Sequence, residues 1–361
     1  MRSKFQVNNR STKSTKLRTD QGSASLKPLS CLRSIVVSIH AGVASEQVLH
    51  NPKFVTLGVV EGVEGWDTLE ERPTGSREKV TVSSPDTGQL MIFKHPKELR
   101  EHQIWSELIA SYIAGDLLGW DVQIAGLGLR NGKPGNLLHY IFNPDAGEQL
   151  VEGWQLCIEV EPTYDIEKGT QHSLTLLAKV ASDVLLPRYE VSTDQFFDFW
   201  ARALALDALI SNTDRHAENW GIIVGPAGNR MAPLYDNATS LGCGIDTKGL
   251  EKFFDHKGEI VVEQLKRFAA KGCHHLRLDS AEKRGARFED VIHAFLGHHP
   301  EKLAHFQSVA DLDLTKVLPL LDALQATNCP DVPHELAVRR SKHIYATLIH
   351  GQERVRRVLQ P

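Results

Sequence analysis

The sequence predicts an α+β protein with two lobes, a small β-rich N-terminal lobe followed by a larger helical lobe. Two patterns support this division. Residues 54–142 carry mostly β-type patterns, whereas most segments after the Pro/Gly-rich stretch 143–147 have apolar residues at helical spacing. The length of 361 residues is also about twice the commonest domain size. We therefore expect a tail at 1–50, the N-terminal lobe at 51–143 and the helical lobe at 144–361.

The first fifty residues have the composition of a disordered basic tail. Residues 1–34 hold eight Lys and Arg residues against one acidic residue, Asp20. Low hydrophobicity combined with net charge favours disorder, and no long apolar stretch indicates a secretory signal. We interpret the segment as a disordered tail or an overlong gene start, while an amphipathic transit peptide of similar composition stays open.

The N-terminal lobe is expected to order its elements as strands, one helix and further strands. Apolar runs typical of strands occur at 54–60, 79–83, 89–94, 122–129 and 136–142. The last two are separated by 131–135, where Asn, Gly and Pro favour a turn. Before them, apolar residues at helical spacing, such as Ile104 and Leu108, predict a helix from about 98 to 118 that ends at Gly119.

The helical lobe is expected to contain a β-hairpin among its helices. Helical apolar periods occur at 173–185, 194–212, 286–297, 301–309, 314–326 and 333–358, the last long enough for one or two helices. The interruption consists of short strands at 221–224 and 231–234 around a turn at 225–229.

The composition limits where the protein works and what it binds. No apolar run approaches the roughly 18 residues of a membrane span, so we expect no membrane contact. The five cysteines are scattered, odd in number and form no CxxC pair, which argues against a zinc site or disulfide framework and favours a reducing cytoplasm. Outside the basic tail the chain is acidic, so direct nucleic-acid binding is not expected.

The strongest chemical signal follows the helix predicted at 194–212. Asp214, Asn219 five residues later, two short strands and then Asp236 occur in the order typical of a protein kinase. Phosphoryl transfer needs a carboxylate that accepts the substrate hydroxyl proton and hard oxygen ligands that hold Mg²⁺ against the phosphates of ATP. We assign Asp214 as the base, and Asn219 and Asp236 as the metal ligands.

Each of these residues alone has a simpler interpretation. Asp and Asn are favoured in turns that end helices, so neither Asp214 nor Asn219 identifies a site by itself. Asp236, however, follows an apolar strand, where an unpartnered carboxylate is costly to bury. We therefore favour the functional interpretation of the ordered set.

The N-terminal lobe should supply a cation for the nucleotide phosphates. Lys94 ends an apolar strand in the expected position, although a strand lysine is usually a solvated edge residue. Glu107, on the helix that follows, is the predicted partner of Lys94, and Glu98 and Glu101 compete for that role.

A loop upstream of the second strand is a weaker candidate for phosphate binding. Gly75 and Ser76 could present backbone N–H groups to phosphates, and Lys79 follows them. The loop has one glycine where GxGxxG has three, so an ordinary loop is an equal alternative.

With these residues placed, the sequence resembles the HipA-like serine/threonine kinases, whose toxin members belong to bacterial toxin–antitoxin systems. The resemblance spans about residues 54–350 and rests on the segments G-S-R-E-K-V at 75–80, F-K-H-P at 93–96, W-S-E at 105–107, N-T-D-R-H-A-E-N at 212–219 and P-L-Y-D at 233–236. It implies a two-lobed kinase fold, ATP and Mg²⁺ as cofactors, a protein substrate with a Ser or Thr acceptor, and an antitoxin-like partner.

The resemblance also implies roles for individual residues. Asp214 resembles the catalytic Asp of the family, His216 and Asn219 resemble nucleotide and metal contacts, and Asp236 resembles the Mg²⁺ ligand. Lys94 resembles the ATP lysine, and Lys79 a further phosphate contact. The chain lacks the additional N-terminal subdomain of the long toxins, and their self-inhibitory loop serine has no clear match.

Three other functions stay open at this point. A kinase-fold enzyme could phosphorylate a lipid or small-molecule hydroxyl by the same chemistry, and the fold could bind nucleotide without turnover. The D-x-H spacing of Asp214 and His216 could instead belong to a two-metal phosphoesterase, which needs further His and Asp clusters. The pairs His274–His275 and His298–His299 are the other histidine clusters, and both lie in charge-rich helical surroundings.

Overall fold

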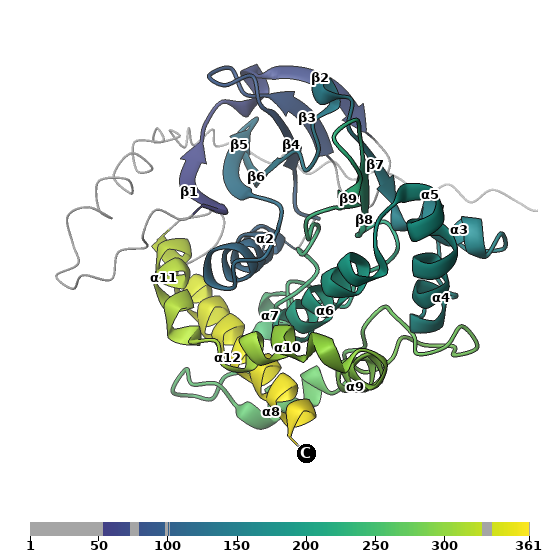
Figure 1. Ribbon diagram of the computed structural model, residues 1–361. Coiled ribbons are helices and arrows are strands. Elements are labelled where there is room, and N and C mark those ends of the chain that lie inside the picture. The colour runs from purple at the N-terminus through teal and green to yellow at the C-terminus, as the bar shows by residue number, and fades with distance from the viewer. Residues whose placement is uncertain (1–52, 73–78, 98–99, 101, 327–333, 361) are drawn as a thin grey trace, which may run out of the picture. The chain divides into compact units, whose positions relative to one another are not determined.

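A six-stranded sheet forms most of the N-terminal part of the chain in the computed structural model, which describes residues 53–72, 79–97, 100, 102–326 and 334–360 (Figure 1). Its strands are β1 (Val55–Val60), β2 (Asp67–Arg72), β3 (Lys79–Ser83), β4 (Leu90–Lys94), β5 (Ala125–Arg130) and β6 (Lys133–His139). They lie in the order β1-β5-β6-β4-β3-β2, and β1 pairs in parallel with β5 while the other pairs are antiparallel. β4, which ends at Lys94, is therefore a central strand.

Two features of this sheet differ from the sequence prediction. β2 was not predicted, because its acidic residues conceal a strand whose partner is the neighbouring β3. The predicted turn 131–135 is wrong, since the turn consists only of Asn131 and Gly132, with φ of 53° and 72°. Positive φ at both central residues gives a tight hairpin turn, so Pro134 belongs to β6 and not to the turn.

Helix α2 (Gln103–Ser111) connects the sheet to the rest of the molecule. Every one of its residues is buried, including the polar Ser106 and Glu107. On the sheet side, Asn136 of β6 donates to the carbonyl of Ile104 at 3.1 Å. On the opposite side, the hydroxyl of Ser106 donates to the carbonyl of Ser240 at 3.0 Å. α2 is thus fixed between the two halves of the site.

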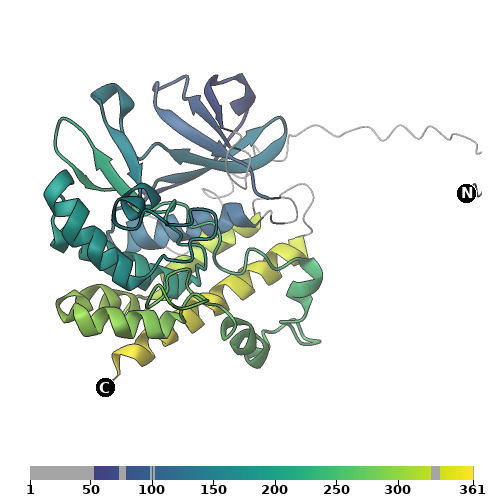
Figure 2. The same cartoon turned by 90° about the vertical axis from the view of Figure 1, so that its right-hand side faces the viewer.

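Helices make up most of the chain after residue 150, and Figure 2 shows them gathered on one side of the large sheet. They are α3 (Gly153–Val160), α4 (Leu174–Lys179), α5 (Leu186–Tyr189), α6 (Thr193–Ile210), α7 (Thr247–Glu251), α8 (Val262–Ala269), α9 (Phe288–His298), α10 (Leu303–Ala310), α11 (Leu318–Ala326) and α12 (His334–Leu359). π-helical segments follow α2 at Tyr112–Leu117 and α4 at Val180–Leu185. None of the described helices is long and apolar enough to cross a bilayer.

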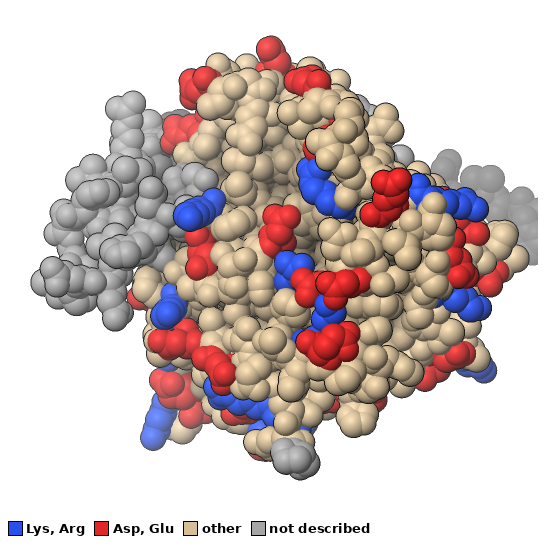
Figure 3. All heavy atoms as spheres, in the orientation of Figure 1, with Lys and Arg blue, Asp and Glu red and all other residues tan. Residues whose placement is uncertain are grey.

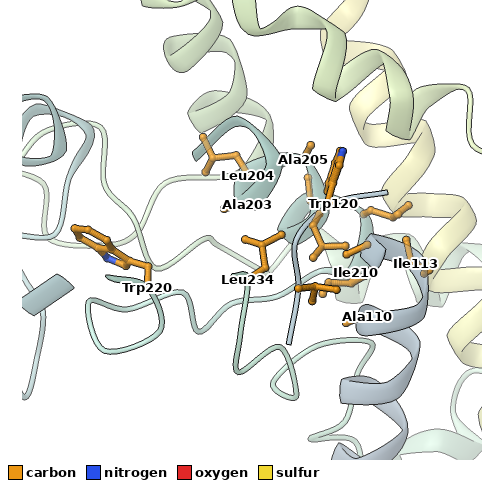
Figure 4. Packing of buried hydrophobic residues seen from close by; sticks show 14 of the residues in the cluster. Ala110, Ile113, Trp120, Ala203, Leu204, Ala205, Ile210, Trp220 and Leu234 are labelled. Atoms are coloured by element: carbon orange, nitrogen blue, oxygen red, sulfur yellow. The ribbon is translucent and has the colours of Figure 1, made fainter. Parts of the chain in front are cut away.

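Helix α6 lies at the centre of the core. Its last two turns are buried on all sides. α6 packs against α12, α10, α9 and β9, and its end at Ile210 shares a buried cluster with Ala110 of α2 (Figure 4). Ile113, Trp120 and Leu234 contribute to the same cluster from other parts of the chain. Because each large apolar side chain contributes about 1.5–3 kcal/mol on burial, this packing fixes the end of α6, where the candidate catalytic residues begin.

A second, three-stranded sheet carries the predicted hairpin. β8 (Gly221–Val224) pairs with β9 (Arg230–Met231), and β7 (Gln149–Glu152) adds to the outer side of β8. The sequence predicted the hairpin but not β7, nor helices α3, α7 and α8, which are short and lie near Gly residues and charges.

Candidate active site

The loop of residues 212–219 leaves the end of α6 through a left-handed residue, Ser211, whose φ is 54°. Asn212 then bonds in two directions, with its amide nitrogen donating to Asp207 at 2.8 Å and its oxygen accepting from the backbone of Asp214 at 3.0 Å. The side chain of Asn219 closes the loop by donating to the carbonyl of Asp214 at 2.7 Å. The backbone of Asp214 is therefore held on both sides, while its carboxylate is 44% exposed.

A fully buried arginine joins this loop to the segment 235–237. Arg215 donates Nε and Nη2 to the two carboxylate oxygens of Asp207, at 3.0 and 2.8 Å. Its Nη1 donates to the carbonyls of Asn219 and Tyr235, at 3.1 and 2.8 Å, and Nη2 also donates to Asn237 at 2.6 Å. Such a fork of charge-assisted bonds fixes orientation as well as distance. Arg215 thus brings the surroundings of Asp214, Asn219 and Asp236 together.

The carboxylate of Asp207 stays charged although it is inaccessible to solvent. Burial by itself would raise the pKa of Asp207, but the charge of Arg215, with hydrogen bonds from His274 and Arg215, lowers it to about 2. His274 lies 3.1 Å from the second carboxylate oxygen and is itself buried. Asp207, Arg215 and His274 therefore form a buried polar network at the base of the 212–219 loop.

Asp236 meets the large sheet through an ion pair with Lys94. The ammonium Nζ lies 2.6 Å from Oδ2 of Asp236, although 142 positions separate the two residues in the chain. Asp236 adopts a left-handed conformation, with φ of 52°, which is uncommon outside glycine. Strained backbone of this kind is characteristic of functional sites. Lys94 and Asp236 therefore face each other across the junction between the sheet and the helical part.

Glu107 lies on the same junction but bonds to the backbone. Its Oε1 accepts the N–H of Asn237 at 2.9 Å, which holds the residue that follows Asp236. The predicted pairing of Lys94 with Glu107 stays a prediction, because the bonds described here assign Lys94 to Asp236 and Glu107 to Asn237.

The donor atoms around Asn219 and Asp236 fit a hard cation. Asn219 uses its amide nitrogen toward Asp214, and within the described residues its Oδ1 accepts no hydrogen bond, so that oxygen is available as a ligand. No group of three or more His, Cys, Asp or Glu residues in the described ranges could hold a metal by itself. Mg²⁺ is usually held by one or two carboxylates together with substrate phosphates and water, so one carboxylate and one amide oxygen suit it. The two-metal phosphoesterase hypothesis gains no support from this part of the chain.

His216 lies at the exposed side of the loop. Its Nε2 is 3.9 Å from Oδ1 of Asp214 and 3.3 Å from the amide nitrogen of Asn219, and its Nδ1 is 3.4 Å from Glu218. The imidazole therefore lies beside both predicted catalytic groups. It also approaches the ring of His275 at 5.8 Å between centroids.

The residue after Asn219 anchors the loop in the core. Trp220 is buried and donates Nε1 to Nε2 of His172 at 3.2 Å, while the two rings stack 6.2 Å apart. Burial lowers the pKa of His172 well below its usual value, so its imidazole stays neutral and accepts this bond.

The remaining predicted residues belong to the phosphate-binding loop. Gly75 and Ser76 lie outside the described residues. Lys79 begins β3 directly opposite Lys94 in the strand pairing. Because paired residues of antiparallel strands project from the same face, Lys79 lies on the face from which Lys94 reaches Asp236.

Four residues of the site were missed by sequence reasoning: Asp207, Arg215, Asn237 and His274. A signal for Asp207 was present, because it is a single carboxylate within the apolar run 203–210 of α6, where a buried charge requires a partner. No comparable signal marks Asn237 or His274, which join the network only through the folding of distant segments.

Comparisons with known proteins identify the family and the fold of the chain. A family model described as the HipA-like C-terminal domain matches residues 72–302. The structure of the proinflammatory kinase CtkA of Helicobacter pylori matches with a TM-score of 0.62 and 16% identity, covering 83% of this chain and 98% of that chain. HipA of Shewanella oneidensis MR-1, from a toxin–antitoxin complex with HipB and operator DNA, matches with a TM-score of 0.40 and 15% identity over 82% of this chain and 69% of that one. No curated protein matches the chain. The likeness to CtkA confirms the two-lobed kinase-like α+β fold.

Proposed function

The chain belongs to the family of HipA-like C-terminal domains, and on that premise we propose that it is an ATP- and Mg²⁺-dependent kinase that phosphorylates serine or threonine hydroxyls of a protein. Family and fold support a kinase-type function. We further propose that the lobes meet near residue 143 and that the enzyme works in the cytoplasm. An antitoxin-like partner stays a prediction that rests on the family resemblance.

One observation carries the proposal, the ion pair of 2.6 Å between Lys94 and Asp236. It brings a cation at the end of β4 against the carboxylate of Asp236, and Arg215 bonds to Tyr235 and Asn237 on either side of that residue. A nucleotide with its Mg²⁺ would engage both partners, Lys94 through a phosphate and Asp236 through the metal. The same two side chains thus supply opposite charges to opposite parts of one ligand.

The proposed roles follow from what each side chain can reach. Bound Mg²⁺ neutralises developing charge on the phosphates, and Asn219 Oδ1 and Asp236 would hold it. Asp214, with its backbone fixed and its carboxylate exposed, accepts the proton of the substrate hydroxyl. The hydroxyl oxygen then bonds to the γ-phosphorus, while the bond from that phosphorus to the β–γ bridging oxygen breaks and ADP leaves with the electron pair.

Substitution of the two aspartates tests these roles. We expect Asp214→Asn to keep ATP affinity but to lose transfer by roughly 10²–10⁴-fold, because the proton acceptor is gone. Asp236→Asn is expected to weaken Mg–ATP binding itself. Both are measured with γ-labelled ATP, nucleotide titration with and without Mg²⁺, and phosphoprotein detection after expression.

Asp86→Asn, an exposed aspartate in the β3–β4 turn, is the control and should behave as wild type. Transfer at wild-type rates by both variants would refute the assignment. ATP binding without transfer by the wild-type protein would favour a silent binding module, and transfer to a lipid or small molecule would exclude a protein acceptor.

A further inference from the structure

We propose that a cationic groove beside Asp214 binds an acidic polypeptide segment and so selects the substrate, an inference that rests on the proposed kinase function. The cationic groove is named for the five Arg and Lys side chains that line it: Arg100, Lys252, Arg267, Lys271 and Arg354. Of these, Arg354 is paired with Glu289 at 3.5 Å.

The groove begins at residues that neighbour the candidate catalytic segments along the chain. A cavity of about 350 Å³ is lined by Ser211 and Thr213, just before Asp214, and by Thr239 and Ser240, just after the 235–237 segment. A hydroxyl of a bound substrate at this end would therefore lie next to the proposed base. Residues of the cavity lining thus adjoin both segments that Arg215 ties together.

The groove continues away from the site along α7 and α8. A second cavity of about 1070 Å³ lies against these helices and shares Arg100, Gly244, Phe268 and Lys271 with the first. Its volume reaches the upper end of the roughly 300–1,000 Å³ of small-molecule sites. Two joined cavities of this extent suit a length of extended polypeptide better than a compact ligand.

Its charge indicates what kind of polypeptide fits. Lys252, Arg267 and Lys271 are exposed, and within the described part of the chain neither they nor Arg100 have an ion-pair partner. Asp246 is the acidic residue that lines the groove, and it accepts from the backbone of Gly249 at 2.7 Å. The face in Figure 3, by contrast, intersperses acidic and basic side chains. Carboxylates of a bound segment would therefore find unneutralised cations here.

An apolar side chain in the groove favours protein over nucleic acid. The ring of Phe268 is 43% exposed and lies where the two cavities meet. A segment with acidic and apolar side chains can use the ring and the cations together.

The test separates substrate binding from catalysis. Two labelled peptides of equal length carry one threonine each, flanked in one by glutamates and in the other by lysines, and binding is followed by anisotropy without ATP. We expect wild type to bind the acidic peptide more tightly, with an affinity that falls with salt, and Arg267→Glu with Lys271→Glu to weaken it about tenfold or more, a change of about 1.4 kcal/mol.

A control with the same change of charge is Lys133→Glu with Lys168→Glu, two exposed lysines outside the groove, which should bind the acidic peptide as wild type does. Equal binding of both peptides, or equal losses in both double variants, would overturn the proposal, as would displacement of the acidic peptide by a single-stranded oligonucleotide that binds more tightly. If the protein bound the acidic peptide but transferred no phosphate, the groove proposal would stand and only the proposed kinase function would be refuted.

Discussion

Arg215 is fully buried, and each of its hydrogen bonds goes to a residue of the candidate site or to Asp207 beneath it. Removal of one partner of a buried ion pair leaves the other charge uncompensated, which costs about 3–5 kcal/mol. We therefore expect Arg215→Met to lower the free energy of unfolding by about that amount, as measured by urea denaturation. Arg215→Lys should recover part of the stability but little of the activity, because an ammonium cannot reproduce the fork.

A control for this change lies on α6, the helix that ends before the loop of Arg215. Arg202 pairs with Asp198 one turn away, at 2.7 Å, and both side chains are partly exposed. Exposed pairs of this spacing contribute about 0.3–0.5 kcal/mol, so Arg202→Met should change stability little. Similar losses in the two variants would contradict the role of Arg215 as the buried connection.

At the level of single residues, the sequence predicts candidates but not their contacts. Asp214, Asn219 and Asp236 are candidates because their order along the chain has chemical meaning, and Lys94 because it ends a strand. The bond from Lys94 to Asp236 crosses 142 positions, and its existence depends on how the sheet lies against the helical part. Local patterns contain no information on such a distance, so the bond between Lys94 and Asp236 could not be predicted from the sequence.

At the level of elements, the turn after Asp236 depends on one glycine. Gly242 has φ of 71°, and a β-carbon there would lie 2.7 Å from the imidazole of His343 on α12. We expect Gly242→Ala to lose the left-handed conformation, at a cost of about 1–2 kcal/mol, and to displace the segment that leads into the groove. Unfolding free energy and peptide affinity both measure this effect.

Gly258→Ala is the control that separates the cost of a left-handed backbone from the cost of the contact with His343. Gly258 has φ of 75° in the turn after α7, and nothing lies within 4 Å of the β-carbon it would gain. The stability lost by Gly258→Ala should therefore equal the cost of the left-handed backbone alone, and the peptide affinity should not change. If Gly242→Ala lowered the free energy of unfolding no more than Gly258→Ala, the contact with His343 would contribute nothing to the loss.

Helices with a clear apolar period along the sequence were predicted. Strands that form only because a neighbouring strand pairs with them were not. α6 and α12 follow their apolar residues to within a few positions of the expected ranges, and α12 forms one helix. β2 and β7 are strands because β3 and β8 offer them free edges. Pro134 was misassigned because the residue favours turns in general, whereas Asn131 and Gly132 suffice for this one.

Over the whole molecule, buried histidines predict how stability depends on pH. Burial lowers the pKa of His102 and His343 to about 3 and that of His275 to about 4. Since the unfolded imidazoles titrate near pH 6.5, the unfolded chain binds more protons between these values, and stability must fall as the pH drops from about 6.5 to about 4. Each group adds a slope of up to about 1.4 kcal/mol per pH unit, measurable by urea denaturation at several pH values.

His343→Phe tests the origin of this slope. Both ring nitrogens of His343 lack hydrogen-bond partners among the described residues, and the ring packs against Phe253 and Phe268. The variant should therefore fold and show a shallower pH dependence than wild type. His256→Ala, an exposed histidine, should leave the slope unchanged, and an unchanged slope in His343→Phe would refute the explanation.

The indole that follows Asn219 gives the protein a built-in optical reporter. Trp220 is attached to the loop by the backbone and to the neutral imidazole of His172 by both a hydrogen bond and ring stacking. Any ligand that shifts Asn219 must therefore disturb the emission of a chromophore one residue away. Nucleotide binding can be followed through that change in emission in an unlabelled sample, with Trp220→Phe as the reference that reports the emission of the other five tryptophans.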